Sequence, residues 1–333
     1  MRSVFIISLC RAWGFLANAD KETVRSFFLV FLFCFSACFS AAAAQGPKAD
    51  WSYVEKKLFK AGFQRGYIKS LKKTYEPKHF ETVVKLNLLL FLVKANYHKV
   101  QVTAEGEKNV LSFLAKNEKV FTQAEKQFGV PRNVIASLLW IETRHGQNQG
   151  MFHVASAYLH LLQSERPSVK KFLQDKAVDY TKNVTKKQRA EIAKRTKTKA
   201  EWALKELRSL QALYRKNSQL ALKLRGSFSG AFGLPQFLPS SYEMYAKSCK
   251  VGKVADLYVP ADAICSVGSY LKKHGWRASK SKTHLAALMK YNNSRDYAEA
   301  ILKLAEKTKS KTPKRLPSNS DQRLPQKDKA DIQ

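Results

Sequence analysis

Apolar side chains recur every three or four positions along most of this chain, which is the spacing of one face of an α-helix. The alternation of apolar and polar residues that is typical of strands is scarce. Residues 51–75 fit two short amphipathic helices broken at Gly62 and Gly66, and residues 106–128 fit a helical stretch that ends at Gly129. The pattern therefore predicts a mostly α protein.

Residues 170–216 combine helical spacing with an excess of positive charge. They hold 15 Lys or Arg against five Asp or Glu, and apolar residues form a stripe between 202 and 213. A solvated helical face is the ordinary interpretation of such a segment. A surface that binds a polyanion is the functional alternative.

The whole chain has 333 residues and a formal net charge of +33. This charge implies an anionic partner or environment, such as nucleic acid, an acidic polysaccharide or an anionic membrane face. No zinc-finger, RNA-recognition or helix-turn-helix signature is found, so we expect no specific nucleic-acid binding. Residues 306–333 are rich in Lys, Pro and Ser, which predicts a disordered basic tail.

The N-terminal residues indicate export. Arg25 precedes an apolar run over 27–39, and small residues follow up to Ala44, which is the order found in secretory signals. We predict a signal peptide over residues 1–44. Two alternatives stay open: an uncleaved membrane anchor, because the run approaches spanning length, and lipidation at Cys38, whose preceding residues faintly resemble a lipoprotein cleavage site.

Removal of the signal leaves Cys249 and Cys265 as the only cysteines. Two cysteines in an exported protein favour one disulfide, although two free buried thiols also fit the sequence.

The first candidate for chemistry is a carboxylate on an apolar helix face. At 100° per residue, Glu142 falls on the same face as Ile135, Leu138 and Leu139. Burial there would raise the pKa of the carboxyl group, as a general acid near neutral pH requires. The alternative is a glutamate that is ion-paired with a neighbouring helix and has no catalytic role.

Two further stretches combine polar and aromatic side chains that suit sugars. Residues 226–245 (GSFSGAFGLPQFLPSSYEMY) place Gln236 in a loop rich in Gly and Pro, beside aromatic residues. A carboxamide can donate to and accept from hydroxyl and N-acetyl groups. Residues 291–298 (YNNSRDYA) bring two tyrosines and two asparagines together. Each stretch taken alone also fits ordinary loop or core residues.

In combination these motifs are far more specific. IETRHG (141–146), GSFSGAFGLPQFLPSSY, PADAICSVGSYLKKHGW (260–276) and YNNSRDY, in this order, resemble the membrane-bound lytic murein transglycosylase B family. The resemblance covers about residues 51–305. It implies a lysozyme-like catalytic domain over 125–305 with a basic helical insertion at about 165–225, and an additional N-terminal helical region over 45–124.

The resemblance also implies non-hydrolytic cleavage of the β-1,4 bond from N-acetylmuramic acid to N-acetylglucosamine in peptidoglycan. Glu142 matches the family's single catalytic glutamate, which acts first as acid and then as base. No cofactor is implied, and glycan strands are the expected partner of a monomer in the periplasm. The family's substrate-binding positions correspond to Ser227, Gln236, Phe237, Tyr270, Tyr291, Asn292 and Tyr297.

The chain departs from the family pattern in two places. Members with a calcium-binding loop carry several Asp residues where this chain has SCKVGKVAD (248–256), so we predict no metal here. The two cysteines bracket this segment, and our hypothesis is that a disulfide replaces the metal as a clamp. The basic insertion and tail could hold an anionic wall polymer or membrane surface.

Two other functions stay open at this point. A lysozyme-type muramidase would use the same fold and bond but would give hydrolysed ends, so only the product distinguishes it. A cell-wall-binding protein without turnover is the other, although the Glu142 and Gln236 motifs argue against it.

Overall fold

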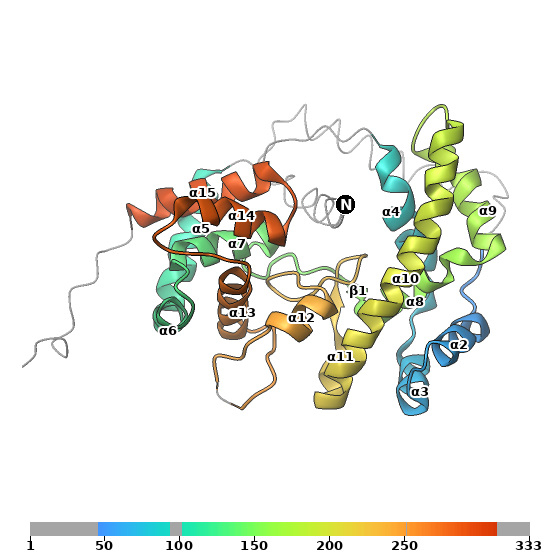
Figure 1. Cartoon of the computed structure of the whole chain (residues 1–333), viewed down its shortest axis with the longest axis horizontal. Helices are drawn as coiled ribbons and strands as arrows, with labels where there is room; N and C mark the ends of the chain where they lie inside the picture. The colour runs from blue at the N-terminus through green and yellow to red at the C-terminus, as the bar shows by residue number, and fades with distance from the viewer. Residues whose placement is uncertain (1–45, 94–101, 251, 312–333) are drawn as a thin grey trace, which may run out of the picture.

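The computed structural model describes residues 46–93, 102–250 and 252–311, and these form a mostly α fold, as predicted (Figure 1). The long elements are α2 (Trp51–Lys60), α3 (Arg65–Thr74), α4 (Phe80–Leu89), α5 (Ala104–Lys116), α6 (Glu118–Phe128), α7 (Arg132–Thr143), α8 (Val154–Leu162), α9 (Pro167–Lys176), α10 (Lys186–Lys216), α11 (Ser218–Lys223), α12 (Pro239–Tyr245), α13 (Pro260–Lys273), α14 (Ser281–Tyr291) and α15 (Arg295–Lys309). Short 3-10 turns are η2 (Pro77–His79), η3 (Leu90–Leu92), η4 (Gln163–Glu165) and η5 (Ala177–Asp179). The strands β1 (Phe152–His153) and β2 (Arg225–Gly226) pair antiparallel.

The glycine signals are only partly reliable. Gly62 lies between α2 and α3 with φ +77, and Gly129 ends α6 with φ +68, a left-handed conformation that glycine adopts without a steric penalty. The predicted break at Gly66 is wrong, because α3 begins at Arg65 and continues through this residue. The helical stretch 106–128 is two helices that meet at Asn117.

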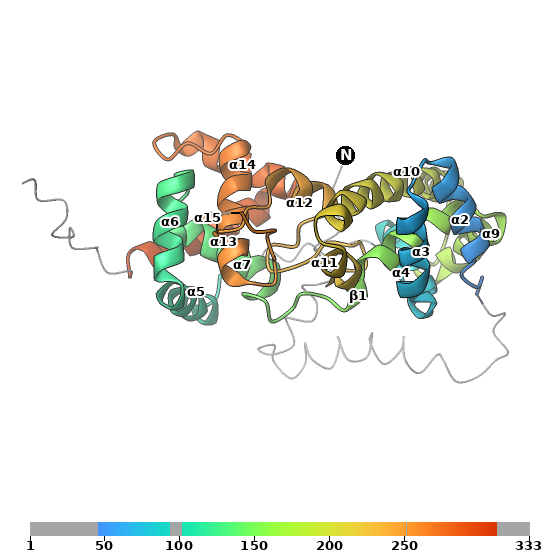
Figure 2. The same cartoon turned by 90° about the horizontal axis from the view of Figure 1, so that it is seen from below.

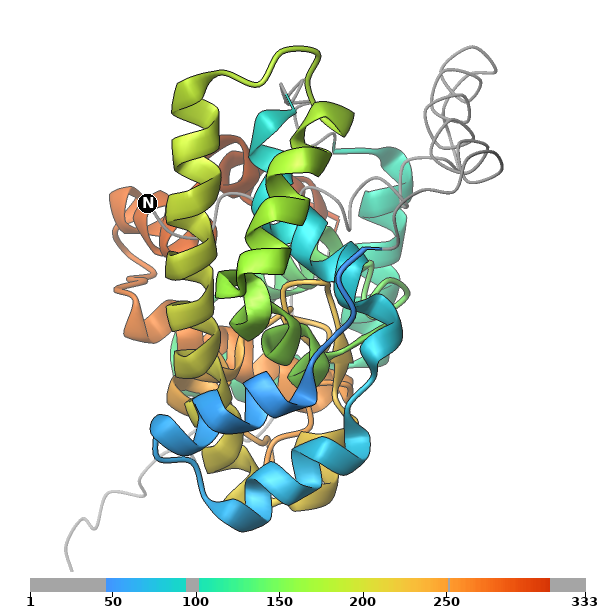
Figure 3. The same cartoon turned by 90° about the vertical axis from the view of Figure 1, so that its right-hand side faces the viewer.

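The helices form two lobes (Figures 1 and 2). We call the first the α7 lobe. In it α7 contacts α5, α6, α13 and α15, and α14 packs on α13 and α15. We call the second the α10 lobe: α2, α3, α4, α8, α9 and α11 pack with or next to α10. Helix α12 contacts both α10 and α13 and so joins the two lobes. Figure 3 shows the long α10 beside α9 and α4.

This packing differs from the predicted domain boundaries. Helix α5 and the first part of α6 fall in the predicted N-terminal region, yet both helices contact the α7 lobe. Helices α2–α4 of the same region pack with the α10 lobe. The expected insertion at 165–225 forms the body of that lobe, because the apolar stripe of α10 is buried at Leu207, Leu210 and Leu213. The predicted boundary at 124/125 therefore falls inside α6, and it divides helices that pack together.

The structure also corrects the predicted start of the C-terminal tail. Helix α15 continues to Lys309 and Thr308 is fully buried, so the predicted tail does not begin at residue 306. The remainder of that tail and the predicted signal peptide lie outside the described residues. Within the ranges that the structure describes, no helix is long and apolar enough to cross a membrane.

Candidate active site

Glu142 lies in the last turn of α7 and is 4% exposed. Its helix is buried on nearly every side, between α5, α6, α13 and α15. The turn after α7 is left-handed at Arg144 and His145, with φ of 50° and 56°. Thr143 Oγ1 donates to the backbone carbonyl of Leu234 at 2.8 Å, so the end of α7 is attached to the predicted sugar-binding loop.

A tyrosine from a distant part of the chain holds the Glu142 carboxyl group. Tyr297 lies on α15, is fully buried, and donates its hydroxyl hydrogen to Glu142 Oε1. Helix α15 packs directly on α7, which brings together two motifs that the sequence separates by 155 positions. The structure therefore unites the predicted catalytic residue with one of its predicted neighbours.

A second tyrosine, Tyr291, lies close enough to Glu142 for the negative charge of the carboxylate to affect it. Burial raises the pKa of Tyr291 well above its usual value, and the negative charge of Glu142 raises it further. The Tyr291 hydroxyl donates to the carbonyl of Pro235, in the same loop that receives Thr143. The Tyr291 hydroxyl thus keeps its hydrogen and fastens the loop beside Glu142, while the Tyr297 hydroxyl donates to Glu142 itself.

Two amide oxygens in this region are buried without a hydrogen-bond partner among the described residues. One is Oδ1 of Asn292, a predicted site residue that is 4% exposed. The other is Oε1 of Gln149, which the sequence reasoning missed. Gln149 is linked to the predicted residue Gln236, because Gln236 Nε2 donates to its backbone carbonyl at 3.1 Å. An unpaired buried acceptor is costly unless a ligand or water supplies a donor.

Gln236 also stabilises its own turn. Its backbone is left-handed, with φ +51, and Nε2 donates to Gly233 O at 3.0 Å as well as to Gln149. Both amide hydrogens are therefore used within the protein. The carboxamide oxygen is the part of Gln236 that can accept from a ligand.

The other predicted site residues hold the loop rather than face outward. The Ser227 hydroxyl accepts from the backbone N–H groups of Ser229 and Ala231, at 3.3 and 3.2 Å. Phe237 is 2% exposed and its ring packs against Tyr270 and Tyr291. The structure shows packing contacts for Phe237 and Tyr270, and their contact with substrate remains a prediction.

The α10 lobe supports the other side of this loop, which sequence reasoning did not anticipate. Asn87 on α4 donates to Phe228 O at 3.0 Å and accepts from Ser229 Oγ at 2.7 Å. Tyr158 on α8 donates to Gly230 O, and a Cβ atom on Gly230 would lie 2.3 Å from its ring. Only glycine fits so close an approach at φ +76.

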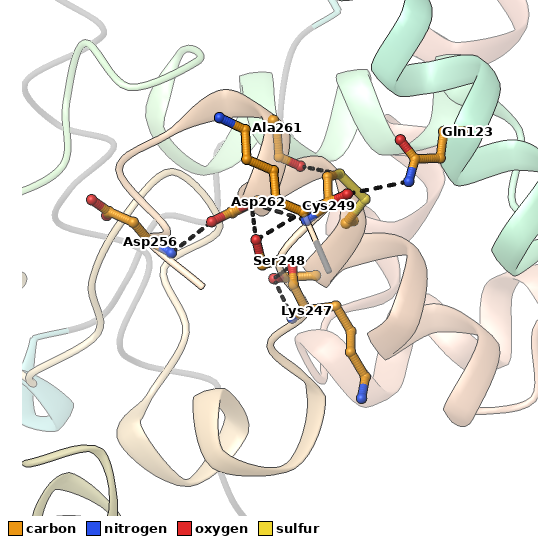
Figure 4. The surroundings of a disulfide bond; sticks show 10 residues. Gln123, Lys247, Ser248, Cys249, Asp256, Ala261 and Asp262 are labelled. Carbon is orange, nitrogen blue, oxygen red and sulfur yellow. Dashed lines mark hydrogen bonds between the residues drawn. A yellow bond between two sulfur atoms is a disulfide. The ribbon is translucent and has the colours of Figure 1, made fainter. Parts of the chain in front are cut away.

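The segment between α12 and α13 is clamped by a disulfide, as predicted (Figure 4). Cys249 is bonded to Cys265 on α13, with the Cα atoms 5.8 Å apart. Beside it, Asp262 Oδ1 accepts from Cys249 N and Ser248 Oγ, and Oδ2 accepts from Asp256 N at 2.8 Å. One carboxylate and one disulfide therefore fasten this loop to the helix that carries Tyr270.

With the geometry around Glu142 described, the sequence and the fold can be compared with those of known proteins. The sequence model for the Transglycosylase SLT domain matches residues 47–285. The chain belongs to this family. It is 26% identical over 245 residues to membrane-bound lytic murein transglycosylase B of Escherichia coli strain K12, a match of 70% of this chain and 58% of that relative. The chain thus matches less than two thirds of the relative's length.

Solved structures share the fold. Soluble lytic transglycosylase SltB1 from Pseudomonas aeruginosa superposes with a TM-score of 0.59 at 21% identity, over 78% of this chain and 98% of that one. Escherichia coli lytic transglycosylase Slt35 in complex with calcium gives 0.58 at 21% identity, over 82% and 96%. SltB3 from Pseudomonas aeruginosa in complex with NAG-NAM-pentapeptide gives 0.56 at 15% identity, over 78% of each chain. The lysozyme-like fold expected from the sequence is therefore confirmed.

Proposed function

We propose that this protein is a lytic transglycosylase, which cleaves the β-1,4 bond from N-acetylmuramic acid to N-acetylglucosamine and leaves 1,6-anhydro-muramyl ends. The observation that carries the proposal is a buried glutamate, Glu142, that accepts a hydrogen bond from a fully buried tyrosine, Tyr297. Glu142 lies within the residues that match the transglycosylase family model. Tyr297 lies beyond them, in the segment YNNSRDY (291–297) that resembles the same family.

In the proposed mechanism Glu142 carries out both proton transfers. Its carboxyl group first donates a proton to the glycosidic oxygen, and the bond from C1 to that oxygen breaks. The resulting carboxylate then takes the proton of the muramyl C6 hydroxyl, and O6 bonds to C1. Glu142 is protonated again at the end of the cycle and no water is consumed. The product therefore ends in the 1,6-anhydro ring that the new bond from O6 to C1 closes.

The surroundings of Glu142 suit both halves of this cycle. Burial disfavours a charged carboxylate and so favours the acid of the first step. The hydrogen bond from Tyr297 favours the carboxylate that exists between the two steps. The two effects oppose each other, and the proposed cycle uses both the acid and the carboxylate form of this residue.

The unpaired amide oxygens offer a way to hold the sugar. Oδ1 of Asn292 and Oε1 of Gln149 are acceptors, and sugar hydroxyls and N-acetyl N–H groups are donors. In this proposal the glycan satisfies them, while Ser227, Gln236 and the aromatic layer of Phe237 and Tyr270 keep the loop in shape.

We also propose that the protein is exported to the periplasm and acts there as a monomer on glycan strands. The net positive charge of the segment 170–216 supports attraction to an anionic wall polymer or membrane surface. The disulfide between Cys249 and Cys265 supports an oxidising compartment. In this loop the covalent bond takes over the fastening role that the calcium ligands have in other members.

Mass spectrometry of the soluble products from purified sacculi tests the proposal. A transglycosylase gives anhydro-muropeptides. Products heavier by one water would instead identify a muramidase that hydrolyses the same bond. Binding to sacculi without any soluble product would identify a wall-binding protein.

A further inference from the structure

One stripe of α10 carries an unusual set of side chains. Arg195, Lys199 and Trp202 follow one another at steps of four and three residues, so they lie on the same face of the helix. All three are partly exposed. The stripe continues into Glu206, which is buried.

This face of α10 is turned toward the loop over 226–231. Arg195 Nη2 donates to the carbonyl of Asn87 at 3.0 Å, and the Asn87 side chain in turn holds Phe228 and Ser229. The ring of Trp202 packs edge-on against Tyr158, whose hydroxyl donates to Gly230. Figure 1 shows α4 and α12 along the side of α10 nearer to the α7 lobe.

The two cations of the stripe lack an ion pair. The Arg195 guanidinium lies 4.8 Å from the centre of the Phe91 ring, and Lys199 Nζ lies 4.1 Å from the centre of the Trp202 ring. In the part of the chain that the structure describes, neither has a carboxylate oxygen within 4.0 Å. Nε of Arg195 is buried and has no hydrogen-bond partner there.

The carboxylate that most favours charged Lys199 is already engaged. Glu206 accepts hydrogen bonds from Ser240 N and Ser240 Oγ, both at 2.9 Å, and from the side chain of Trp202. Burial, together with the nearby charge of Arg195, lowers the pKa of Lys199 to about 8. Two like charges that are partly removed from water and have no carboxylate partner destabilise a fold, and an anionic ligand would offset that cost.

We propose that Arg195 and Lys199, against the rings of Phe91 and Trp202, form a subsite for a carboxylate group of the peptide stem on the glycan strand. The inference rests on the proposed function, because peptidoglycan is the polymer that brings such carboxylates to this loop. A single carboxylate can accept one hydrogen bond from each cation, and such charge-assisted bonds are among the stronger ones in proteins. The aromatic rings lie against both cations and help to hold them in position.

Calorimetric titration of the purified protein with two soluble ligands tests the subsite. One ligand is the N-acetylglucosaminyl-N-acetylmuramyl disaccharide with a tripeptide, and the other is the same disaccharide without peptide. We expect the peptide-bearing ligand to bind more tightly to the wild type. Arg195→Met and Lys199→Met should each weaken its binding about tenfold and leave the peptide-free ligand unchanged.

Two further variants separate a specific contact from general charge. Lys197→Met removes the same charge from an exposed position on the same helix and should change neither affinity. Lys199→Arg keeps the charge and should retain most of the preference for the peptide-bearing ligand.

Three results would overturn the subsite: no preference in the wild type, an equal loss for both ligands, or an equal loss in Lys197→Met. Cleavage of sacculi is measured separately. A protein that shows the ligand preference but releases no products would contradict the proposed function and leave the subsite standing.

Discussion

Two helical segments, one from each lobe, differ sharply in net charge. Residues 104–143, which contain α5, α6 and α7, hold five Lys or Arg and five Asp or Glu. Residues 170–216, which contain α10, hold 15 and five. Both lobes bury apolar helix faces in one connected core. Since both segments bury apolar faces, packing does not account for the excess of positive charge in residues 170–216.

The acids of the α7 lobe are largely used inside it. Glu107 pairs with Lys307 and Lys311, and Glu125 pairs with Arg132. Glu142 instead accepts from Tyr297, a neutral donor. We therefore propose that the α7 lobe carries out the proton transfers and that the α10 lobe binds anionic groups. The following changes test that proposal.

Apart from replacement of Glu142 itself, the largest effect is expected from Tyr297→Phe, which removes the donor to Glu142. Loss of a hydrogen bond to a charged group costs about 1.5–3 kcal/mol, so kcat should fall roughly 10- to 100-fold with little change in KM. Steady-state kinetics on soluble glycan strands measures both constants.

Tyr67→Phe is the matched control in the α10 lobe. Tyr67 is also buried, but its hydroxyl has no hydrogen-bond partner among the described residues. Its removal should leave kcat unchanged. A loss of kcat as large as that of Tyr297→Phe would show that the effect is one of packing and not of proton transfer.

Replacement of both disulfide cysteines by serine is expected to lower the free energy of unfolding by about 3 kcal/mol, since the bond closes a loop of 16 positions. Denaturant unfolding measures this change. Calcium should not restore the lost stability, and a chelator should not alter the wild type. Recovery with calcium would contradict the view that the disulfide stands in place of a metal.

Acid should weaken the α10 lobe through His160, which is 1% exposed on α8. Burial lowers its pKa to about 3. The unfolded chain therefore binds a proton below about pH 6.5 that the folded chain rejects, and stability falls as pH drops toward 3. In His160→Asn this loss should be smaller by roughly 2 kcal/mol between pH 6.5 and pH 5. Parallel unfolding curves at both pH values, with the same pH slope for wild type and variant, would exclude this role.

The smallest effect is expected from the exposed outer face of α10. Joint replacement of Lys194, Lys197 and Lys205 by Gln should weaken sacculus binding about threefold at low salt and have no effect at high salt. Lys126→Gln, an exposed change in the α7 lobe, should not change binding. A loss that persists at high salt would indicate a specific contact rather than diffuse attraction.

Some of this arrangement could be read from the sequence. Glu142 shares a face with Leu138 and Leu139, and that spacing correctly placed it in a buried position. The cysteine count led to the disulfide between Cys249 and Cys265. These signals are local or follow from counting.

The support of the loop could not be read in this way. Asn87 and Ser229 are 142 positions apart, and no spacing rule connects an asparagine on one helix with a serine in a distant loop. The lobes themselves are discontinuous in sequence, because the chain leaves the α10 lobe after α4 and returns to it at α8. The predicted break at Gly66 was wrong because a glycine destabilises a helix by only about 1 kcal/mol. The burial of Tyr67 and Ile68, which follow it in α3, offsets that cost.

The most direct test of the central claim compares Glu142→Gln with the wild type on purified sacculi, with binding and soluble products measured in the same samples. The account predicts that the variant binds as the wild type does and releases no anhydro-muropeptides, because the amide can neither donate nor take up the proton. Anhydro-muropeptides released by Glu142→Gln at a rate near that of the wild type would contradict the assignment of proton transfer to this residue.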